Sequence, residues 1–115
     1  QVILGHMGEL LPFALWRVDN SNAWITERNT FPAKKRIRDY FRENFHVTTS
    51  GNFHTPALLS AMLEVGADRI MFSTDWPFEN IDHAANWFDA CDISENDRQK
   101  IGRTNARRLF KLGND

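Results

Sequence analysis

Short apolar runs alternate with helical patterns along the chain. The runs at 2–5, 45–49 and 69–73 are rich in β-branched, aliphatic or aromatic residues, which predicts three strands. Helical spacing of apolar residues predicts helices at about 9–27, 34–43 and 55–66, and two more after Asn80 and Ser94. The order is strand–helix three times over, with extra helices after the first and the last strand.

Local signals set the expected helix ends. Thr55 before Pro56 is typical of an N-cap, Gly66 of a helix end, and Asn80 and Ser94 of further caps. The segment 20–22 is expected to interrupt the first helix, and 29–32 to form a loop. The expected buried faces are Leu11, Leu15 and Val18 on the first helix and Leu58, Leu59, Met62 and Leu63 on the third.

Alternating strands and helices predict an α/β fold with a parallel sheet. Three parallel strands are too few to cover both faces of a sheet, whereas a (β/α)8 barrel takes about 250 residues. We therefore expect residues 1–115 to be the last three units of such a barrel, with no internal domain boundary. The start at Gln1 without Met and the load of nine Phe and four Trp agree with a piece of a longer protein.

Composition excludes several classes of protein. The net charge of −1, from 14 basic and 15 acidic residues, gives no nucleic-acid footprint. No apolar run approaches 20 residues and no signal-peptide pattern is present, so neither a membrane span nor secretion is indicated. The single Cys91 excludes an intramolecular disulfide and favours a reducing compartment, the cytoplasm, with Cys91 itself as a packing residue.

Polar residues follow each predicted strand at its carboxyl end, where parallel α/β folds place their sites. His6 and Asp75 would meet there at the mouth of one pocket. Glu9 is either a first-turn helix acid or the partner that orients His6. Asp75 is followed by Trp-Pro, which leaves the capping of the next helix to Asn80 and favours a functional role for Asp75.

Side chains alternate along a strand, and this extends the prediction. Two groups are expected to point into the pocket: Val2 and Leu4 with His6, and Met71 and Ser73 with Asp75. His6 alone could equally be a loop residue that only forms hydrogen bonds. The other three histidines have no ligand spacing and are read as structural: His46, His54 and His83.

Four segments in this order resemble the amidohydrolase-2 branch of the amidohydrolase superfamily: Ile-Leu-Gly-His-Met-Gly-Glu at 3–9, Thr-Thr-Ser-Gly-Asn at 48–52, Phe-Ser-Thr-Asp-Trp-Pro-Phe-Glu at 72–79 and Asn-Ala-Arg-Arg-Leu-Phe at 105–110. The resemblance runs nearly end to end and is strongest to the hydroxybenzoate decarboxylases. It implies a distorted (β/α)8 barrel with one divalent metal, Zn or Mn, and no organic cofactor.

The resemblance also implies roles for single residues. Asp75 matches a metal ligand and proton donor, whereas the other ligands of the family lie outside this sequence. His6 matches an active-site imidazole paired with Glu9. With one ligand the free chain is expected to bind no metal tightly and to be inactive.

The implied substrate is an ortho-hydroxybenzoate: 2,6- or 2,3-dihydroxybenzoate or salicylate. Phe78 is expected to pack on the substrate ring. Arg17 is expected to bind a carboxylate in its own or a neighbouring subunit, and the alternative for Arg17 is a surface ion pair. The full-length protein is expected to be a homo-oligomer, a dimer or tetramer. Two alternatives stay open: a hydrolase or hydratase of the same superfamily, and a non-catalytic truncated fragment.

Overall fold

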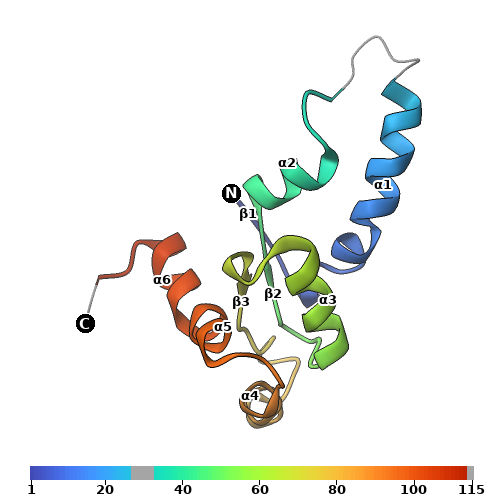
Figure 1. The fold of residues 1–115 in the computed structure, drawn as a ribbon. Coiled ribbons are helices and arrows are strands. Elements are labelled where there is room, and N and C mark those ends of the chain that lie inside the picture. The colour runs from blue at the N-terminus through green and yellow to red at the C-terminus, as the bar shows by residue number, and fades with distance from the viewer. Residues whose placement is uncertain (27–32, 114–115) are drawn as a thin grey trace.

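The computed structural model describes residues 1–26 and 33–113, which fold around a three-stranded parallel sheet (Figure 1). The strands are β1 (Val2–Leu4), β2 (Phe45–Thr48) and β3 (Ile70–Met71), in that spatial order. Ile3 lies opposite His46, and Val47 lies opposite Ile70. Among the described residues, the outer edges of β1 and β3 pair with no further strand, so the sheet is open on both sides.

Helices connect and follow the strands as the sequence predicted. Their bounds are α1 (Leu11–Thr26), α2 (Ile37–Asn44), α3 (Thr55–Val65), α4 (Ile81–Ala90), α5 (Glu95–Gln99) and α6 (Asn105–Phe110). Two 3-10 turns, η1 (His6–Gly8) and η2 (Ala67–Arg69), precede α1 and β3. A π-helical turn, η3 (Lys100–Thr104), joins α5 to α6. The segment 29–32, expected to be a loop, lies outside the described residues.

One apolar core holds the strands against the helices. Val47 and Ile70 of the sheet are fully buried with Leu58 of α3. The core is completed from every side by Met7, Leu15, Phe41, Ala61, Val65, Phe88, Cys91 and Ile101. Figure 1 shows α1 and α3 to the right of the strands, α5 and α6 to the left, α2 above and α4 below. This core fixes the positions of the loops at both ends of the sheet.

Some predicted helix faces were wrong. Leu63 is 83% exposed, and α3 buries Ala61 and Val65 beside Leu58 instead. On α1 only Leu15 of the expected stripe is buried, and the helix continues through 20–22 without interruption. Aliphatic residues occur on more than one side of both helices, so spacing alone could not select the side that packs.

Caps were predicted more accurately than faces. The Asn80 side chain accepts a hydrogen bond from the His83 amide at 2.9 Å, and Ser94 accepts one from Asp97 at 3.1 Å. Thr55, expected to cap α3, is instead inside the helix and His54 stands at the cap position. The Thr55 hydroxyl accepts a hydrogen bond from the Trp87 indole at 3.2 Å, so tertiary contacts outcompeted the local cap.

The predicted alternation held for β3 and failed for β1. Ile70 packs into the helix-side core, and Met71 lines a pocket of about 230 Å3 on the other face with Ile3. Leu4 packs against the core, so it faces away from Met71 rather than with it. The cause is that the extended backbone of β1 ends before His6, whose φ is +49°. Within the described residues no helix is both long and apolar enough to cross a bilayer.

Candidate active site at the carboxyl ends of the strands

The turn after β1 turns His6 and Glu9 outward while it anchors Met7 in the core. The Gly8 amide bonds the Gly5 carbonyl at 2.8 Å, and the Glu9 amide bonds the His6 carbonyl at 3.0 Å. His6, Met7 and Glu9 all have φ between +49° and +57°. Such conformations are uncommon outside glycine and are found at sites that the surrounding structure holds in place. Here the anchor is Met7, which is 3% exposed.

A glycine is required in this turn. Gly8 has a φ of +75°, and a Cβ built on it would lie 2.8 Å from a methyl group of Val47. The backbone of the turn therefore rests directly on β2, which fixes the height of His6 above the sheet.

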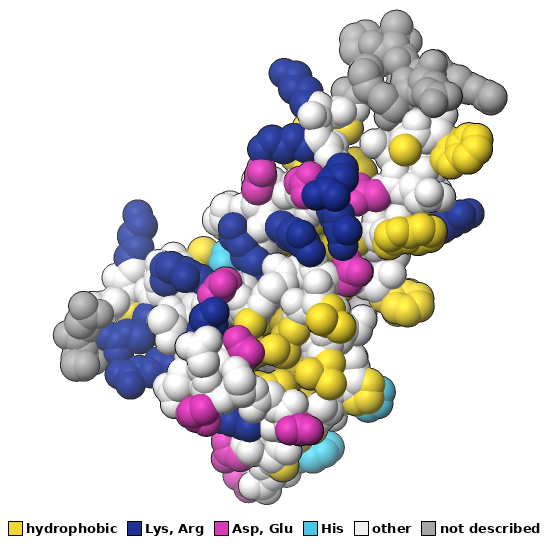
Figure 2. Space-filling view, viewed as in Figure 1, with side chains coloured by type: hydrophobic (Ala, Val, Ile, Leu, Met, Phe, Trp, Pro, Cys, Tyr) yellow, Lys and Arg dark blue, Asp and Glu magenta, His cyan; other side chains and the backbone are white. Residues whose placement is uncertain are grey.

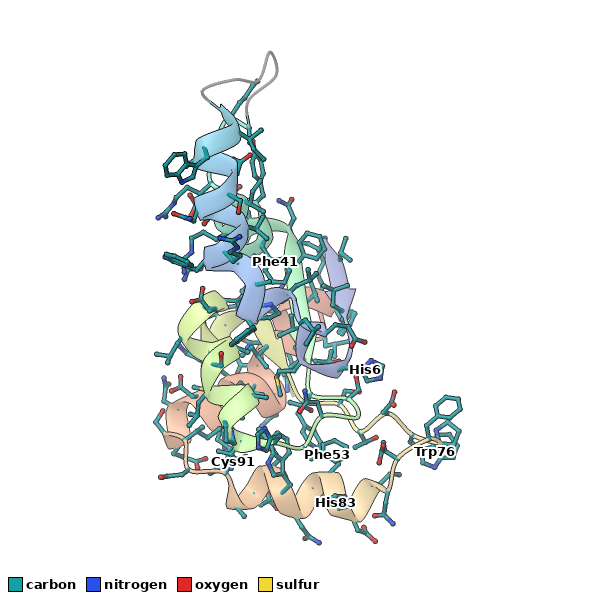
Figure 3. All side chains as sticks on the ribbon, turned by 90° about the vertical axis from the view of Figure 1, so that its right-hand side faces the viewer. His6, Phe41, Phe53, Trp76, His83 and Cys91 are labelled. Carbon is teal, nitrogen blue, oxygen red and sulfur yellow. The ribbon has the colours of Figure 1, made fainter. Side chains whose placement is uncertain are left out.

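The His6 imidazole lies between two carboxylates. Its Nδ1 is 2.7 Å from Oε1 of Glu9, and its Nε2 is 3.4 Å from Oδ2 of Asp75, which follows β3. Glu9 precedes the first turn of α1, so its contact with His6 favours the partner role over that of a helix acid. The sequence prediction that His6 and Asp75 meet is confirmed. Figure 3 shows His6 at the end of the strands, beside the loop that carries Trp76.

Both carboxylates favour the protonated imidazole. The hydrogen bond with Glu9, and secondly that with Asp75, raises the pKa of His6 above its ordinary value. The three side chains are accessible, with exposed fractions of 48% for His6, 70% for Glu9 and 29% for Asp75. The cluster can therefore hold and exchange a proton at a surface open to a ligand.

The backbone of Asp75 is also unusual. Its φ is +67°, and its carbonyl accepts hydrogen bonds from the amides of Phe78 at 2.9 Å and Glu79 at 3.2 Å. The carbonyl thus closes the loop on itself, while the side chain points to His6. As the sequence analysis expected, Asp75 does not cap α4, and Asn80 is the cap.

Sequence reasoning missed the support that the loop after β2 gives to this site. A Cβ on Gly51, whose φ is +65°, would lie 2.8 Å from Cδ2 of His6 and 3.1 Å from Oδ2 of Asp75. Ser50 accepts a hydrogen bond from the His6 amide at 3.4 Å. At the sequence level Gly51 belongs to the segment 48–52 and has no predicted role of its own. Its place at the carboxyl end of the strand between those of His6 and Asp75 was the signal that could have found it.

Thr49 ties the same loop to the end of β3. Its hydroxyl donates to the Ser73 carbonyl at 2.8 Å and accepts from the Ser73 amide at 2.9 Å. Thr49 is fully buried, so this pair of bonds fixes the spacing between the loop under His6 and the loop that bears Asp75.

The structure does not bring Phe78 and Arg17 into the cluster. Phe78 is 85% exposed and lines an open pocket of about 570 Å3 formed by residues 76–82. Arg17 is exposed on α1 and has no hydrogen bond or ion pair to another described residue. Neither side chain therefore joins the cluster of His6, Glu9 and Asp75, and the expectation that both residues contact a substrate stays a prediction.

Comparison with known proteins identifies the family. A model of the amidohydrolase family matches residues 1–112. The chain belongs to the amidohydrolase family. Over 111 residues it is 68% identical to the gamma-resorcylate decarboxylase of Rhizobium sp. (strain MTP-10005), an alignment that covers 96% of this chain and 34% of the relative. The chain thus spans about a third of the length of the curated relatives it matches.

Solved structures of family members superpose closely on this chain. A 2,6-dihydroxybenzoate decarboxylase in complex with 2,6-dihydroxybenzoate gives a TM-score of 0.88 at 68% identity, over 96% of this chain and 34% of that one. The dihydroxybenzoic acid decarboxylase of Polaromonas sp. JS666, with bound manganese and the inhibitor 2-nitroresorcinol, gives 0.91 at 63% identity, over 100% and 35%.

The residues of this amidohydrolase chain do not complete a metal site. Within 1–26 and 33–113, no group of three or more His, Cys, Asp or Glu side chains is placed to hold a metal ion. Asp75 offers a single carboxylate, one oxygen of which faces His6. Catalytic zinc sites, for example, use three protein ligands. A metal bound at Asp75 would therefore need further ligands from outside the described residues.

Proposed function

We propose that residues 1–115 form the carboxyl-terminal three strand–helix units of a (β/α)8 barrel, without an internal boundary. The parallel order of the strands and their two unpaired edges support a larger sheet, because an exposed edge is normally paired or covered. The coverage of about a third of each relative supports a chain of roughly three units in eight.

The complete protein, in this proposal, is a non-oxidative decarboxylase of ortho-hydroxybenzoates, with 2,6-dihydroxybenzoate as the preferred substrate. The observation that carries it is the His6 imidazole held between Glu9 and Asp75 at the carboxyl ends of the strands. The 68% identity to a gamma-resorcylate decarboxylase favours the 2,6-isomer over 2,3-dihydroxybenzoate and salicylate.

Asp75 is proposed to deliver a proton to the ring carbon that bears the carboxylate. The protonated ring then loses CO2, and the electron pair of the broken carbon–carbon bond restores the aromatic ring. The reaction consumes one proton for each CO2 released. His6 lies within reach of Asp75 through Nε2, so it would return a proton to Asp75 for the next turnover, while Glu9 holds the ring in place.

Asp75 would also be one ligand of a divalent metal, with the remaining ligands supplied outside this chain. Manganese is favoured over zinc because manganese is bound in the Polaromonas decarboxylase. When bound, the metal would stabilise negative charge on the substrate oxygens. The proposal requires no organic cofactor, and the free, buried Cys91 supports the reducing cytoplasm as its compartment.

Phe78 and Arg17 are proposed to act on the substrate ring and carboxylate, respectively. Arg17 lies on α1 between Phe13 and Trp24, which are 83% and 72% exposed, beside Trp16 at 62%. A helix with apolar residues on all sides is normally covered. This supports a homo-oligomer in which α1 is buried and Arg17 approaches either its own site or that of a neighbour.

The experiment is an assay of the complete protein carrying this sequence, loaded with manganese, for CO2 release from 2,6-dihydroxybenzoate. We expect release of CO2 with formation of resorcinol, and slower turnover of 2,3-dihydroxybenzoate and salicylate. Hydrolysis of a lactone without CO2 release would favour the hydrolase alternative instead. An intact mass near 13.4 kDa for the native protein would favour the truncated, non-catalytic fragment.

A further inference from the structure

A second cluster of polar side chains lies at the amino ends of the strands, opposite to the ends that carry His6 and Asp75. His46 is the second residue of β2, and Arg69 directly precedes β3. A pocket of about 440 Å3 opens between these residues and α6. We refer to it as the basic pocket, and its lining residues are Gln1, His46, Asp68, Arg69, Arg108 and Leu109.

His46, which lines this pocket, has a ring nitrogen without a hydrogen-bond partner among the described residues. Its side chain is buried, with the residue 5% exposed, and its Nε2 is 3.1 Å from Nη1 of Arg69. A guanidinium only donates, so Nε2 accepts and the ring proton of the neutral imidazole is on Nδ1. Nδ1 is buried without a hydrogen-bond partner in the described part of the chain. An orphaned buried donor of this kind is rare in native proteins.

The same ring is held neutral by its surroundings. Burial, and secondly the charges of Arg69 and Arg108, lower the pKa of His46 below its ordinary value. The nearby carboxylate of Asp68 does not offset this, because it is 57% exposed and pairs with Nζ of Lys100 at 3.2 Å.

The two arginines have only neutral partners among the described residues. Arg69 donates to the side-chain oxygen of Gln1 at 3.2 Å and to His46. Arg108 donates to the backbone carbonyl of Asp68 and to the Asn105 side chain, both at 3.1 Å. Arg38, in contrast, meets the carboxylate of Glu64 at 2.5 Å. Arg69 is partly buried and Arg108 is exposed, so both guanidinium groups are accessible. Neither has a counter-charge among the described residues, and a carboxylate or phosphate would give both of them charge-assisted hydrogen bonds.

We propose that the basic pocket binds an oxyanion, with Arg69 and Arg108 as its cationic partners and Nδ1–H of His46 as a neutral donor. The pocket lies at the edge of the sheet opposite to His6 and Asp75, so this site is separate from the proposed active site. Carboxylate and phosphate share the required chemistry. The anion is either a side-chain carboxylate from a part of the complete protein outside this chain, or a free small anion.

The test is thermal unfolding of the complete protein with Arg69→Gln, Arg108→Gln and both changes together, with Arg103→Gln as the matched control on an exposed arginine of η3. If an anion joins the two arginines, each single change lowers Tm by roughly 2–4 °C, and the double change lowers it by less than the sum. The control leaves Tm unchanged. Without an anion, each variant loses only its own hydrogen bonds, those of Arg69 to Gln1 and His46 or those of Arg108 to Asp68 and Asn105, so the two losses of Tm add in the double variant.

A phosphate titration at constant ionic strength identifies the source of the anion. If the anion is free, inorganic phosphate raises the Tm of the unchanged protein, and Arg69→Gln abolishes this rise. If a carboxylate of the protein fills the pocket, the variants lower Tm as above and phosphate has no effect. Variants with unchanged or raised Tm and no phosphate effect would overturn the proposal, as would fully additive losses of Tm.

Discussion

The two ends of the strands, which we call the carboxyl edge and the amino edge of the sheet, use polar residues in opposite ways. At the carboxyl edge, His6 and Asp75 are accessible, sit on backbone with positive φ and face groups of opposite charge. At the amino edge, His46 and Asn105 are buried on ordinary backbone and contact a cation or neutral carbonyls. The carboxylates raise the pKa of His6, whereas burial and arginine charges lower that of His46.

This contrast separates residues that can act on a ligand from residues that stabilise the fold. Polar groups that remain accessible can meet a ligand, and the strained backbone that presents them has to be held by packed neighbours. Polar groups that are fully buried can contribute to the fold only if they are satisfied. We therefore expect changes at the carboxyl edge to reduce turnover with little loss of stability, and changes at Asn105 to do the reverse.

The largest effect is expected at Asp75. In the complete protein, Asp75→Asn removes the proposed proton donor and one metal-ligand charge. Turnover of 2,6-dihydroxybenzoate should fall at least ~100-fold. Steady-state assays with manganese content measured in parallel check this, and near-normal turnover with manganese retained would contradict the role of Asp75.

Asn105→Leu is expected to act through the fold. Both hydrogen bonds of the Asn105 amide, to the carbonyls of Ala67 and Ile70, are 2.7 Å long, and the side chain is fully buried. A leucine would remove both bonds and leave the buried Ile70 carbonyl without this partner, whereas the Ala67 carbonyl still accepts from the Ile70 amide. This should lower the free energy of unfolding by about 2 kcal/mol. Denaturant unfolding measures this, and turnover per folded molecule should stay close to that of the unchanged protein.

Gly51→Ala sharpens the comparison by changing only the support of the site. The added methyl group would press against His6 and Asp75, and a displacement of this kind should lower turnover by about tenfold or more. Gly66→Ala is the matched control, since Gly66 also has a positive φ, +88°, but has no atom within 4 Å of the added group. Equal turnover of the two variants would show that backbone strain alone accounts for the loss.

Much of this arrangement could be predicted because it follows from chain order. Parallel strands bring their carboxyl ends to one edge, so the loops at His6 and Asp75 had to lie near each other. The Asn80 cap was equally local, as its hydrogen bond to His83 spans three residues. Signals of this kind do not depend on the rest of the fold.

The parts that could not be predicted depend on packing. The sequence does not show the positive φ of His6, and this is why the expected side of Leu4 was wrong. Leu63 and Phe13 have the apolar character of core residues, yet both are exposed. In the proposed barrel or oligomer such residues would be covered by other segments, which a single chain cannot identify.

The coupling of His6 and Glu9 should give a smaller, differential effect. Because the 2.7 Å contact is the direct link of Glu9 to the site, loss of His6 removes what Glu9 contributes. The double change His6→Asn with Glu9→Gln should therefore turn over within about twofold of His6→Asn alone. Fully additive losses of kcat would mean that Glu9 acts on its own, as a charge near the substrate.

The smallest effect is expected in the titration of His6. Since the hydrogen bond to Glu9 is the largest cause of its raised pKa, Glu9→Gln should move the His6 midpoint to lower pH. The raised pKa means that the ion pair stabilises the fold below the unfolded pKa and loses this contribution as the pH rises through the folded pKa. This contribution is small for so exposed a pair, so histidine ring NMR is the suitable measurement rather than melting.

The same spectra test the two edges against each other. His46, whose pKa is lowered, should titrate at lower pH than His6 and should not respond to Glu9→Gln, because it lies at the opposite edge of the sheet. Glu79→Gln is the control, since it removes an exposed carboxylate of the Asp75 loop, whereas the carboxylates that bond the His6 ring are those of Glu9 and Asp75. If Glu9→Gln left the His6 midpoint unchanged, the 2.7 Å contact would not set the charge of the imidazole, and the carboxyl edge would owe its electrostatics to Asp75 alone.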